Sequence, residues 1–512
     1  MSIATKHLPY VLALDIGSSS VRATIYDARA RVVPGLTVAT PHVTPTTSDG
    51  GAVEDPIGLA RVVEQALDEI MRLAGKAAYE IVAVGLDTFV GNLLGVDADR
   101  NPTTPVYTYA DTRSKAEVSQ MRHDLDAVAI HQRTGAMLHT AYAPARLKWI
   151  RRTEPEAWDK TKLWTNFASF LYSRWFGVDA ACSSSVASWS GLMNRHTGKW
   201  DDELLEYADV SVAELPRLAE YGDAISGLLP VYAHKWPALK QASFCLAVGD
   251  GAAANVGERC SSPGNTALTV GTTGAVRAGV PIPLETVPRG LSVYNLSSER
   301  ILLGGAVTDA GSLFAWMSKT FALPRPETLE TEISSLPPNG HGLTVLPFLR
   351  GERSPGWLDD ATGAVLGLRA STTPAEIVRA GLESVAYRFT LIAKRLSTAV
   401  ALGEEIIVGG GAAQSSPTWL QMFADVLGST VVESAEPETT SRGSAILALE
   451  SAGVIASLDD IPVDRGGRYN PNLASNEAYQ AGLKRHHQFY HSLLDPQDEK
   501  GSYSSECDHD PI

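Results

Sequence analysis

Short apolar runs and amphipathic stripes alternate along the first half of the chain. Apolar residues 11–14 and 21–26 flank a small polar turn at 15–20, which predicts a β-hairpin. A third strand is expected near 31–33, then a loop over 41–51 and buried strands over 80–86 and 93–96. Helical spacing over 59–73 predicts one apolar face made of Leu59, Val62, Val63, Ala66, Ile70 and Leu73. Strands that alternate with helices predict an α/β sheet.

The same order of elements returns in the second half. Residues 267–270 and 275–277 flank a glycine turn at 271–274, which predicts a second hairpin. Further elements are expected here: helices at 251–256, 374–396, 417–427 and 444–453, and strands at 344–349 and 405–408. In the middle of the chain, 143–175 predicts helical pieces, and the small residues of 180–194 predict a loop or short strands. The halves repeat in architecture, not in residues.

The length predicts two domains, because 512 residues are too many for one hydrophobic core. We expect an N-terminal domain over 1–246 and a C-terminal domain over 247–475. A C-terminal helix and a disordered acidic tail are expected over 476–512.

Composition then narrows the class of protein. The net charge of -15 argues against a nucleic-acid-binding surface, since neutralising phosphates requires a basic face. The four cysteines form no C-x-x-C pair, which fits a reducing compartment and argues against a zinc site. There is no apolar leader and no apolar run long enough to span a membrane. We therefore expect a soluble, cytoplasmic protein with no membrane or nucleic-acid partner.

The two glycine turns are candidate phosphate clamps. Gly17, Ser18 and Ser19 form the first turn, and Gly271, Thr272 and Thr273 form the second. Glycine lets a backbone approach a ligand closely, and successive N–H groups in such a turn bind anions. Two clamps half a chain apart predict a nucleotide held between two domains.

Two carboxylates and a glycine run complete the candidate site, each with a competing structural explanation. Asp15 ends a strand and suits Mg²⁺ held through water, or it simply stabilises a turn. Asp250 suits a general base on a substrate hydroxyl, or a helix N-cap. The run 409–411 leaves bare backbone for a flat ring, or is an ordinary strand-to-helix turn. No P-loop, H-E-x-x-H or G-x-S-x-G motif is present.

The order of these blocks resembles the FGGY family of carbohydrate kinases over residues 10–471. Similar blocks are 12–22 (LALDIGSSSVR), 247–253 (AVGDGAA), 268–274 (LTVGTTG), 346–355 (LPFLRGERSP), and 409–411 with 419–428 (GGG and WLQMFADVLG). The resemblance implies a two-domain α/β fold of the actin/hexokinase/Hsp70 (ribonuclease H-like) type, with a cleft between the domains.

The resemblance also implies roles. Asp250 is expected to be the catalytic base, and Asp15 to organise Mg²⁺. ATP is expected to meet the two turns and five further residues: Gly305, Gly311, Gly410, Gly411 and Ser415. Phosphoryl transfer needs positioning and charge neutralisation, which this set supplies.

The acceptor site departs from the xylulose kinases it resembles. Their S-G-Q-M-H-G is here replaced by residues 87–92, DTFVGN, so that Gly91 stands at the histidine position. The W-x-D-x-R block is replaced by 109–113, YADTR, which looks like gluconate-kinase-like members. The substrate residues expected from these blocks are Thr88, Phe89, Asn92, Asp111 and Arg113, beside Asp250. Asp111 and Arg113 equally suit a local surface ion pair.

These features predict an ATP- and Mg²⁺-dependent kinase that phosphorylates a primary hydroxyl of a small sugar. D-xylulose is the first candidate, with gluconate or another polyol or sugar acid as the alternative. An actin- or Hsp70-like ATPase switch without a sugar substrate is the rival from another class. A homodimer is compatible with the resemblance, since many relatives are dimers.

Overall fold

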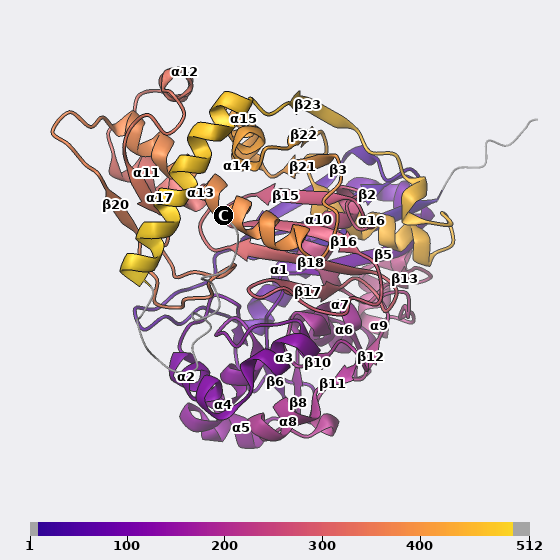
Figure 1. Ribbon diagram of the computed structural model, residues 1–512. Coiled ribbons are helices and arrows are strands. Elements are labelled where there is room, and N and C mark those ends of the chain that lie inside the picture. The colour runs from indigo at the N-terminus through magenta and orange to yellow at the C-terminus, as the bar shows by residue number, and fades with distance from the viewer. Residues whose placement is uncertain (1–8, 495–512) are drawn as a thin grey trace, which may run out of the picture.

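The computed structural model describes residues 9–494, which form two mixed β-sheets with helices around them (Figure 1). The first sheet has the strand order β13-β5-β1-β2-β3, and β14 also pairs with β5. Its strands are β1 (Tyr10–Ile16), β2 (Ser20–Tyr26), β3 (Val32–Pro41), β5 (Ile81–Thr88), β13 (Ser243–Phe244) and β14 (Val248–Gly249).

The second sheet repeats this layout. Its order is β17-β18-β16-β15-β21-β22-β23. The strands are β15 (Thr266–Val270), β16 (Gly274–Val280), β17 (Ser292–Asn295), β18 (Ile301–Val307), β21 (Glu405–Gly409), β22 (Thr430–Ser434) and β23 (Arg465–Tyr469). In each sheet an antiparallel hairpin, β1–β2 or β15–β16, pairs on its other side with a parallel strand, β5 or β21. The predicted architectural repeat is confirmed.

Most of the predicted helices are present, and their ends carry the expected caps. α1 (Pro56–Ala74) starts with Asp55, whose side chain accepts hydrogen bonds from two backbone N–H groups. α13 (Pro374–Ser397) starts with a capping box between Thr373 and Glu376. Further helices of the second half are α11 (Gly311–Thr320), α12 (Pro326–Ser335), α14 (Gly411–Gln414), α15 (Pro417–Leu427) and α17 (Leu473–Leu494). Leu73 is a correction, because it is 40% exposed and lies outside the buried face of α1.

Two small-residue helices join the halves. α10 (Asp250–Gly257) packs against α16 (Thr439–Ser451), and α16 also lies on β1 and β5 although it follows the second sheet in sequence (Figure 1). A Cβ atom at Gly443 would overlap the Ala253 backbone, and one at Gly257 would overlap that of Thr439. The close backbone packing therefore requires glycine at both helices.

Residues 93–242 form a mostly helical region beside the first sheet, at the bottom of Figure 1. Its helices are α2 (Lys115–Asp124), α3 (Ala127–Thr134), α4 (Ala143–Thr153), α5 (Pro155–Lys160), α6 (Phe167–Phe176), α7 (Ser184–Ser188), α8 (Asp202–Ala208) and α9 (Pro230–Lys235). Its strands are β6 (Leu94–Val96), β7 (Val106–Tyr107), β8 (Leu163–Thr165), β9 (Cys182–Ser183), β10 (Met193–Asn194), β11 (Lys199–Trp200) and β12 (Leu218–Ala219). The helix α7 falls where a loop or short strands were expected.

Several boundaries differ from the prediction. The strand expected over 344–349 is β19 (Thr344–Leu346), which pairs with β20 (Ala364–Leu366), and α16 begins five residues earlier than expected. Val248 and Gly249 of β14 belong to the first sheet, although the division at 246/247 assigned them to the second domain. The expected disordered tail after Leu494 lies outside the described residues. Within residues 9–494, no helix combines the length and apolar character that a membrane crossing requires.

Candidate active site

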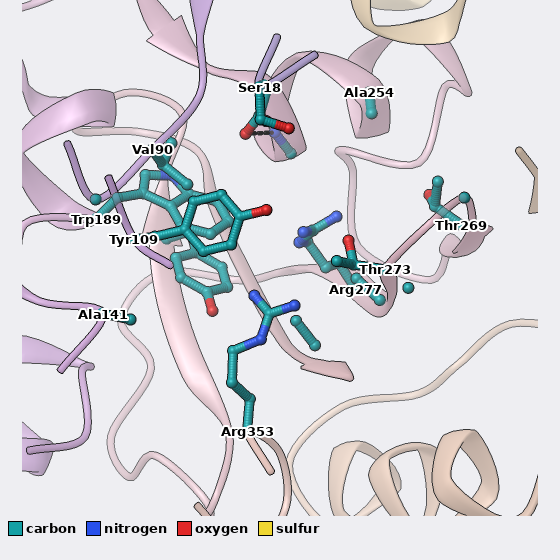
Figure 2. A pocket seen from close by; sticks show the side chains of 18 of the residues that line it. Ser18, Val90, Tyr109, Ala141, Trp189, Ala254, Thr269, Thr273, Arg277 and Arg353 are labelled. Carbon is teal, nitrogen blue, oxygen red and sulfur yellow. Dashed lines mark hydrogen bonds between the residues drawn. The ribbon is translucent and has the colours of Figure 1, made fainter. Parts of the chain in front are cut away.

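A cavity of about 230 Å³ lies between the two halves, and both hairpins reach it (Figure 2). Ser18 comes from the first turn, and Gly271 and Thr273 from the second. The remaining lining residues come from loops, helices and strands of both halves: Val90, Gly91, Tyr109, Ala141, Tyr142, Trp189, Asp250, Gly251, Ala254, Thr269, Gly274, Ala275, Arg277, Tyr294, Ala306, Arg353, Trp357 and Thr440. The cavity therefore joins segments that lie far apart in the sequence.

The first turn is held from the side of β3. The Gly17 N–H donates to the Ser20 carbonyl at 3.0 Å, which closes the turn. His42 Nε2 contacts the Gly17 carbonyl at 2.9 Å, and the His42 N–H donates to the Ser19 carbonyl at 3.0 Å. Ser18 and Ser19 remain exposed. Their hydroxyls and N–H groups are thus free to meet a phosphate.

The second turn is held by the start of α11. The Gly271 N–H donates to the Thr273 carbonyl at 2.9 Å, and the Gly311 N–H donates to the Gly271 carbonyl at 2.9 Å. The Ser312 N–H donates to the Thr272 carbonyl at 3.0 Å. The predicted nucleotide residue Gly311 therefore supports this turn and does not line the cavity.

The other predicted nucleotide glycines surround the second turn. Gly410 follows β21 at φ +96°, and a Cβ atom there would lie 2.5 Å from the Val270 carbonyl oxygen. Gly305 is buried in β18, whereas Gly411 and Ser415 are exposed on α14 and just after it. None of these four residues lines the cavity.

Asp250 lies in the cavity as the first residue of α10. Gly249 is the N-cap, so the competing N-cap explanation for Asp250 is wrong. Its Oδ1 accepts a hydrogen bond from the Gly251 N–H at 2.7 Å, which orients the carboxyl. Burial raises the pKa of Asp250 to about 6, against the opposing charge of Arg277. Such a carboxylate is ionised at neutral pH and basic enough to take a proton from a hydroxyl.

Asp15 lies beside a second buried carboxyl that the sequence analysis did not assign. The register of β1 and β5 places Asp15 opposite Asp87, whose Oδ2 accepts from the Ser444 hydroxyl at 2.6 Å. Burial raises the pKa of both carboxyls, and the charge of Asp15 raises that of Asp87 further. Arg22 contacts Asp15 Oδ2 at 3.4 Å. The pKa of Asp87 is therefore raised more strongly than that of Asp15, whose negative charge Arg22 stabilises.

This donor set fits a magnesium ion held through water. Magnesium prefers oxygen ligands and usually keeps several waters beside one or two carboxylates. Asp15 ends β1 directly before the first turn and supplies such a carboxylate. Within the described residues, no group of three or more histidine, cysteine or acidic side chains forms a ready-made metal cage.

The predicted acceptor residues after β5 point into the protein core. Thr88 and Phe89 are fully buried, and Phe89 stacks on Phe167 with ring centroids 6.4 Å apart. The Asn92 side chain donates to the Phe89 carbonyl and accepts from the Phe167 N–H at 2.7 Å. Their neighbours Val90 and Gly91 line the cavity instead. The predicted loop reaches the cavity, but through different residues.

Asp111 and Arg113 form a buried structural pair outside the cavity lining. Asp111 is 2% exposed and accepts from the Ala52 N–H at 3.1 Å. Arg113 contacts it at 2.6 Å and lies over the Trp149 ring at 4.4 Å. The two residues therefore form the local ion pair of the second expectation, although Asp111 is buried and only Arg113 is partly exposed. Tyr109, from the same block, is the residue that reaches the cavity.

Gly91 has a backbone that excludes the family histidine. Its φ is +66°, and a Cβ atom would lie 2.7 Å from the Ala141 carbonyl oxygen. A side chain is strained in this conformation. The donors lost from this loop are therefore not recovered by a simple substitution at Gly91.

The loop after β19 explains part of the GERSP block. Arg350 pairs with the buried Asp309 at 3.0 Å, and Glu352 forms a buried ion pair with Arg388. Both contacts anchor the loop. Arg353 lines the cavity, where its guanidinium lies 5.8 Å from the centroid of the Tyr109 ring.

Sequence reasoning missed several cavity residues. Arg277, Trp189, Tyr142 and Tyr294 were not singled out, although all four line the cavity. The available signal for Arg277 was a charged residue inside the apolar run of β16. The three aromatic residues carry no such signal, since buried aromatic rings are common in protein cores.

Comparison with known proteins follows this geometry. Two models of the FGGY family of carbohydrate kinases, for its N-terminal and C-terminal domains, match residues 10–257 and 266–452. The chain belongs to the FGGY family of carbohydrate kinases. It is therefore a kinase that uses ATP and an alcohol acceptor, and it has the two-domain, actin-like fold. The expected family and fold are confirmed.

Individual relatives of this FGGY kinase are distant. It is 26% identical over 471 residues to a gluconokinase of Bacillus subtilis (strain 168), covering 90% of this chain and 91% of the relative. It is 28% identical over 496 residues to a glycerol kinase of Acidovorax sp. (strain JS42), covering 92% and 96%.

Solved structures of Lactobacillus acidophilus proteins share the fold. A gluconate kinase superposes with a TM-score of 0.87 at 23% identity, covering 95% of this chain and 98% of that one. A xylulose kinase superposes with a TM-score of 0.87 at 24% identity, covering 96% and 99%. At these identities the likeness carries the fold alone.

Proposed function

We propose that this FGGY kinase transfers the γ-phosphate of ATP to a hydroxyl of a small sugar or sugar derivative bound in the cavity. The observation that carries the proposal is the position of Asp250, in one cavity with residues of both glycine turns. An acceptor hydroxyl beside Asp250 then lies between a base and the two phosphate clamps. Few other arrangements bring these three parts together.

The reaction needs little covalent chemistry from the protein. Asp250 accepts the proton of the acceptor hydroxyl while the hydroxyl oxygen forms a bond to the γ-phosphorus of ATP. The bond from that phosphorus to the β–γ bridging oxygen breaks, and ADP leaves. Ser18 and Thr273 line the cavity, one from each turn, and would both meet the transferring phosphate. Asp15 would hold Mg²⁺ through water, and that ion would neutralise phosphate charge. The two turns supply N–H donors whose positions are fixed before ATP binds.

D-xylulose and gluconate remain the two acceptor candidates from the sequence. A relative named gluconokinase supports gluconate, and a relative named glycerol kinase extends the range to polyols. The cavity loop around Gly91 lacks the donors of the usual xylulose kinases. A site without such donors discriminates weakly among neutral sugars.

An ADP-release screen over ketoses, polyols and aldonates tests the proposal. ADP should form only when an acceptor is present. Acceptor-independent ATP hydrolysis that no sugar stimulates would favour the actin-like switch instead.

The matched variant for this screen is Asp250→Asn. We expect kcat to fall by two to four orders of magnitude, about 3–5 kcal/mol, while ATP still binds. In the parent, kcat/KM for the acceptor should rise with pH through about 6, because Asp250 acts only when ionised. A variant within about threefold of the parent turnover would remove Asp250 from the role of base.

A further inference from the structure

The cavity contains more positive than negative side-chain charge. Arg277 from β16 and Arg353 from the loop after β19 both line it, and Asp250 is its one lining carboxylate among the described residues. Figure 2 shows both arginine side chains directed into the space beside Tyr109. The charges of Arg277 and Arg353 each lower the pKa of Asp250, so the three groups share one electrostatic environment. Two arginines and one carboxylate leave one positive side-chain charge unbalanced in the cavity lining.

Arg277 has no direct ion-pair or hydrogen-bond partner for its guanidinium among the described residues, although the charge of Asp250 acts on it from a longer distance. Among the described residues its guanidinium makes no ion pair within 4.0 Å, and its Nε atom is buried without a hydrogen-bond partner. The guanidinium instead lies over two aromatic rings, 5.5 Å from Trp189 and 5.9 Å from Tyr294. These rings stack on each other with centroids 3.5 Å apart. They fix the plane of the guanidinium and leave its N–H groups without an acceptor.

Arg353 differs in having a fixed partner. Its guanidinium donates to the Val307 carbonyl oxygen at 2.9 Å. This bond anchors Arg353 to β18. Arg277 is therefore the cavity cation with the larger unmet hydrogen-bonding capacity.

Burying a guanidinium that has no direct ion-pair partner costs free energy. Burial lowers the pKa of Arg277, which reports the cost of its charge in this environment. Guanidinium groups bind carboxylates and phosphates through two parallel N–H bonds. The missing partner is thus an anion that arrives with a ligand.

Two kinds of anionic group enter a kinase cavity. One is the phosphate chain of ATP, and the other is any anionic group that the acceptor carries. Arg277 lies three residues along β16 from Gly274, where the second turn ends, which is roughly 10 Å of strand. A Cβ atom at Gly251 would lie 2.7 Å from an Arg277 guanidinium nitrogen, so Arg277 packs against the start of α10. This position favours the acceptor side of Asp250 over the phosphate side.

We propose that the acceptor carries a carboxylate and that Arg277 binds it, so that the substrate class is the sugar acids and, within it, the aldonates. This inference rests on the proposed kinase function and sharpens it. The carboxylate end of the acceptor pairs with Arg277, and a hydroxyl further along the chain reaches Asp250. Among the two candidates from the sequence, the geometry favours gluconate over D-xylulose.

The first experiment uses the unmodified protein and acceptors of equal chain length with and without a carboxylate. D-gluconate, D-gluconamide and D-glucitol have the same carbon chain, and D-xylonate with D-xylulose forms a second pair. We expect kcat/KM for gluconate to exceed that for gluconamide by about a hundredfold, since a charged hydrogen-bond pair is lost. A ketose or polyol preferred over every aldonate would overturn the inference and leave the kinase function intact. No turnover with any acceptor would instead contradict the kinase function.

The second experiment compares Arg277→Met and Arg277→Lys. The ratio of gluconate to gluconamide kcat/KM should collapse at least tenfold in Arg277→Met and be partly restored in Arg277→Lys. The loss should lie mainly in the KM for gluconate, and calorimetry of gluconate binding should show the same loss. Removing Arg277 also raises the pKa of Asp250, so the variants are compared at pH 8.5, where that base is ionised in all forms.

A different pattern would reassign Arg277. If Arg277→Met lowered kcat equally for gluconate and gluconamide, or raised the KM for ATP instead, the arginine would serve the phosphate and the inference would be wrong. Thermal melting and ATP calorimetry on each variant verify that the cavity is folded. The comparison of gluconate with gluconamide in the parent stands without any variant.

Discussion

The two glycine turns have similar residues and closely related hairpins, yet they are built into the protein differently. Each closes on itself with one short backbone bond, Gly17 to Ser20 or Gly271 to Thr273. The first turn is then held by His42, whose ring contacts the Gly17 carbonyl. The second is held by backbone N–H groups at the start of α11. One clamp thus depends on a titratable side chain, and the other on close backbone packing.

The strands beside the turns differ in charge as well. The first hairpin carries Asp15, with Asp87 beside it on β5. The second carries Arg277, which faces the cavity. We infer that the first hairpin contributes to metal binding and that the second contributes to acceptor binding. The repeat therefore preserves the turn chemistry, while single residues on the strands separate the functions.

The largest expected effect on the free energy of unfolding comes from Gly410, which supports the strand leading into the second turn. Alanine there would adopt φ +96° and place Cβ 2.5 Å from the Val270 carbonyl oxygen. We expect Gly410→Ala to lower the free energy of unfolding by about 2–4 kcal/mol and to raise the KM for ATP. The neighbouring Gly411→Ala is the matched control, because nothing lies within 4 Å of its Cβ position. Denaturant unfolding that gave equal losses for both variants would contradict this account of the support.

A smaller expected effect on stability compares the two turns directly. A Cβ atom at Gly311 would lie 2.6 Å from the Gly271 carbonyl oxygen, whereas one at Gly17 would lie 3.2 Å from that of Ser20. Gly311→Ala should cost about 1–3 kcal/mol of stability, and Gly17→Ala less than about 1 kcal/mol. Thermal melts of the two variants under one buffer measure this difference. If Gly17→Ala were the more damaging change, the first turn would be the tighter of the two.

The smallest expected effect is on the pH dependence of stability, and it involves the first turn alone. His42 Nδ1 lies 3.3 Å from Glu54 Oε1, and the contact with that carboxylate raises the His42 pKa. A raised folded-state pKa stabilises the protein fully below the unfolded value near 6.5 and loses this contribution as pH rises through the folded value. We expect His42→Gln to remove about 0.5–1 kcal/mol of stability at pH 6 and less at pH 8.5.

The control for this prediction is His123→Gln, on the exposed surface of α2. It should leave the difference in unfolding free energy between pH 6 and pH 8.5 unchanged. A pH dependence that survives in His42→Gln would mean that other groups cause it.

Local patterns in the sequence determined most elements of this protein. Both hairpins and the helices at 374–396 and 417–427 were predicted within three residues at each end, because alternation, capping and glycine turns act between near neighbours. The turn residues and the cavity position of Asp250 follow from the same kind of signal. The family blocks then gave the order of the parts.

The tertiary structure alone decided which side chains meet in the cavity. Thr88, Phe89 and Asn92 turn inward because Phe89 packs on Phe167, and this leaves Val90 and Gly91 facing the ligand space. The pairing of Asp15 with Asp87 depends on the register of two strands about seventy residues apart. The contact of Arg277 with the stacked rings of Trp189 and Tyr294 depends on elements that are distant in the sequence. Sequence patterns fix the direction of a side chain relative to its own element, but packing between distant elements fixes what that side chain faces.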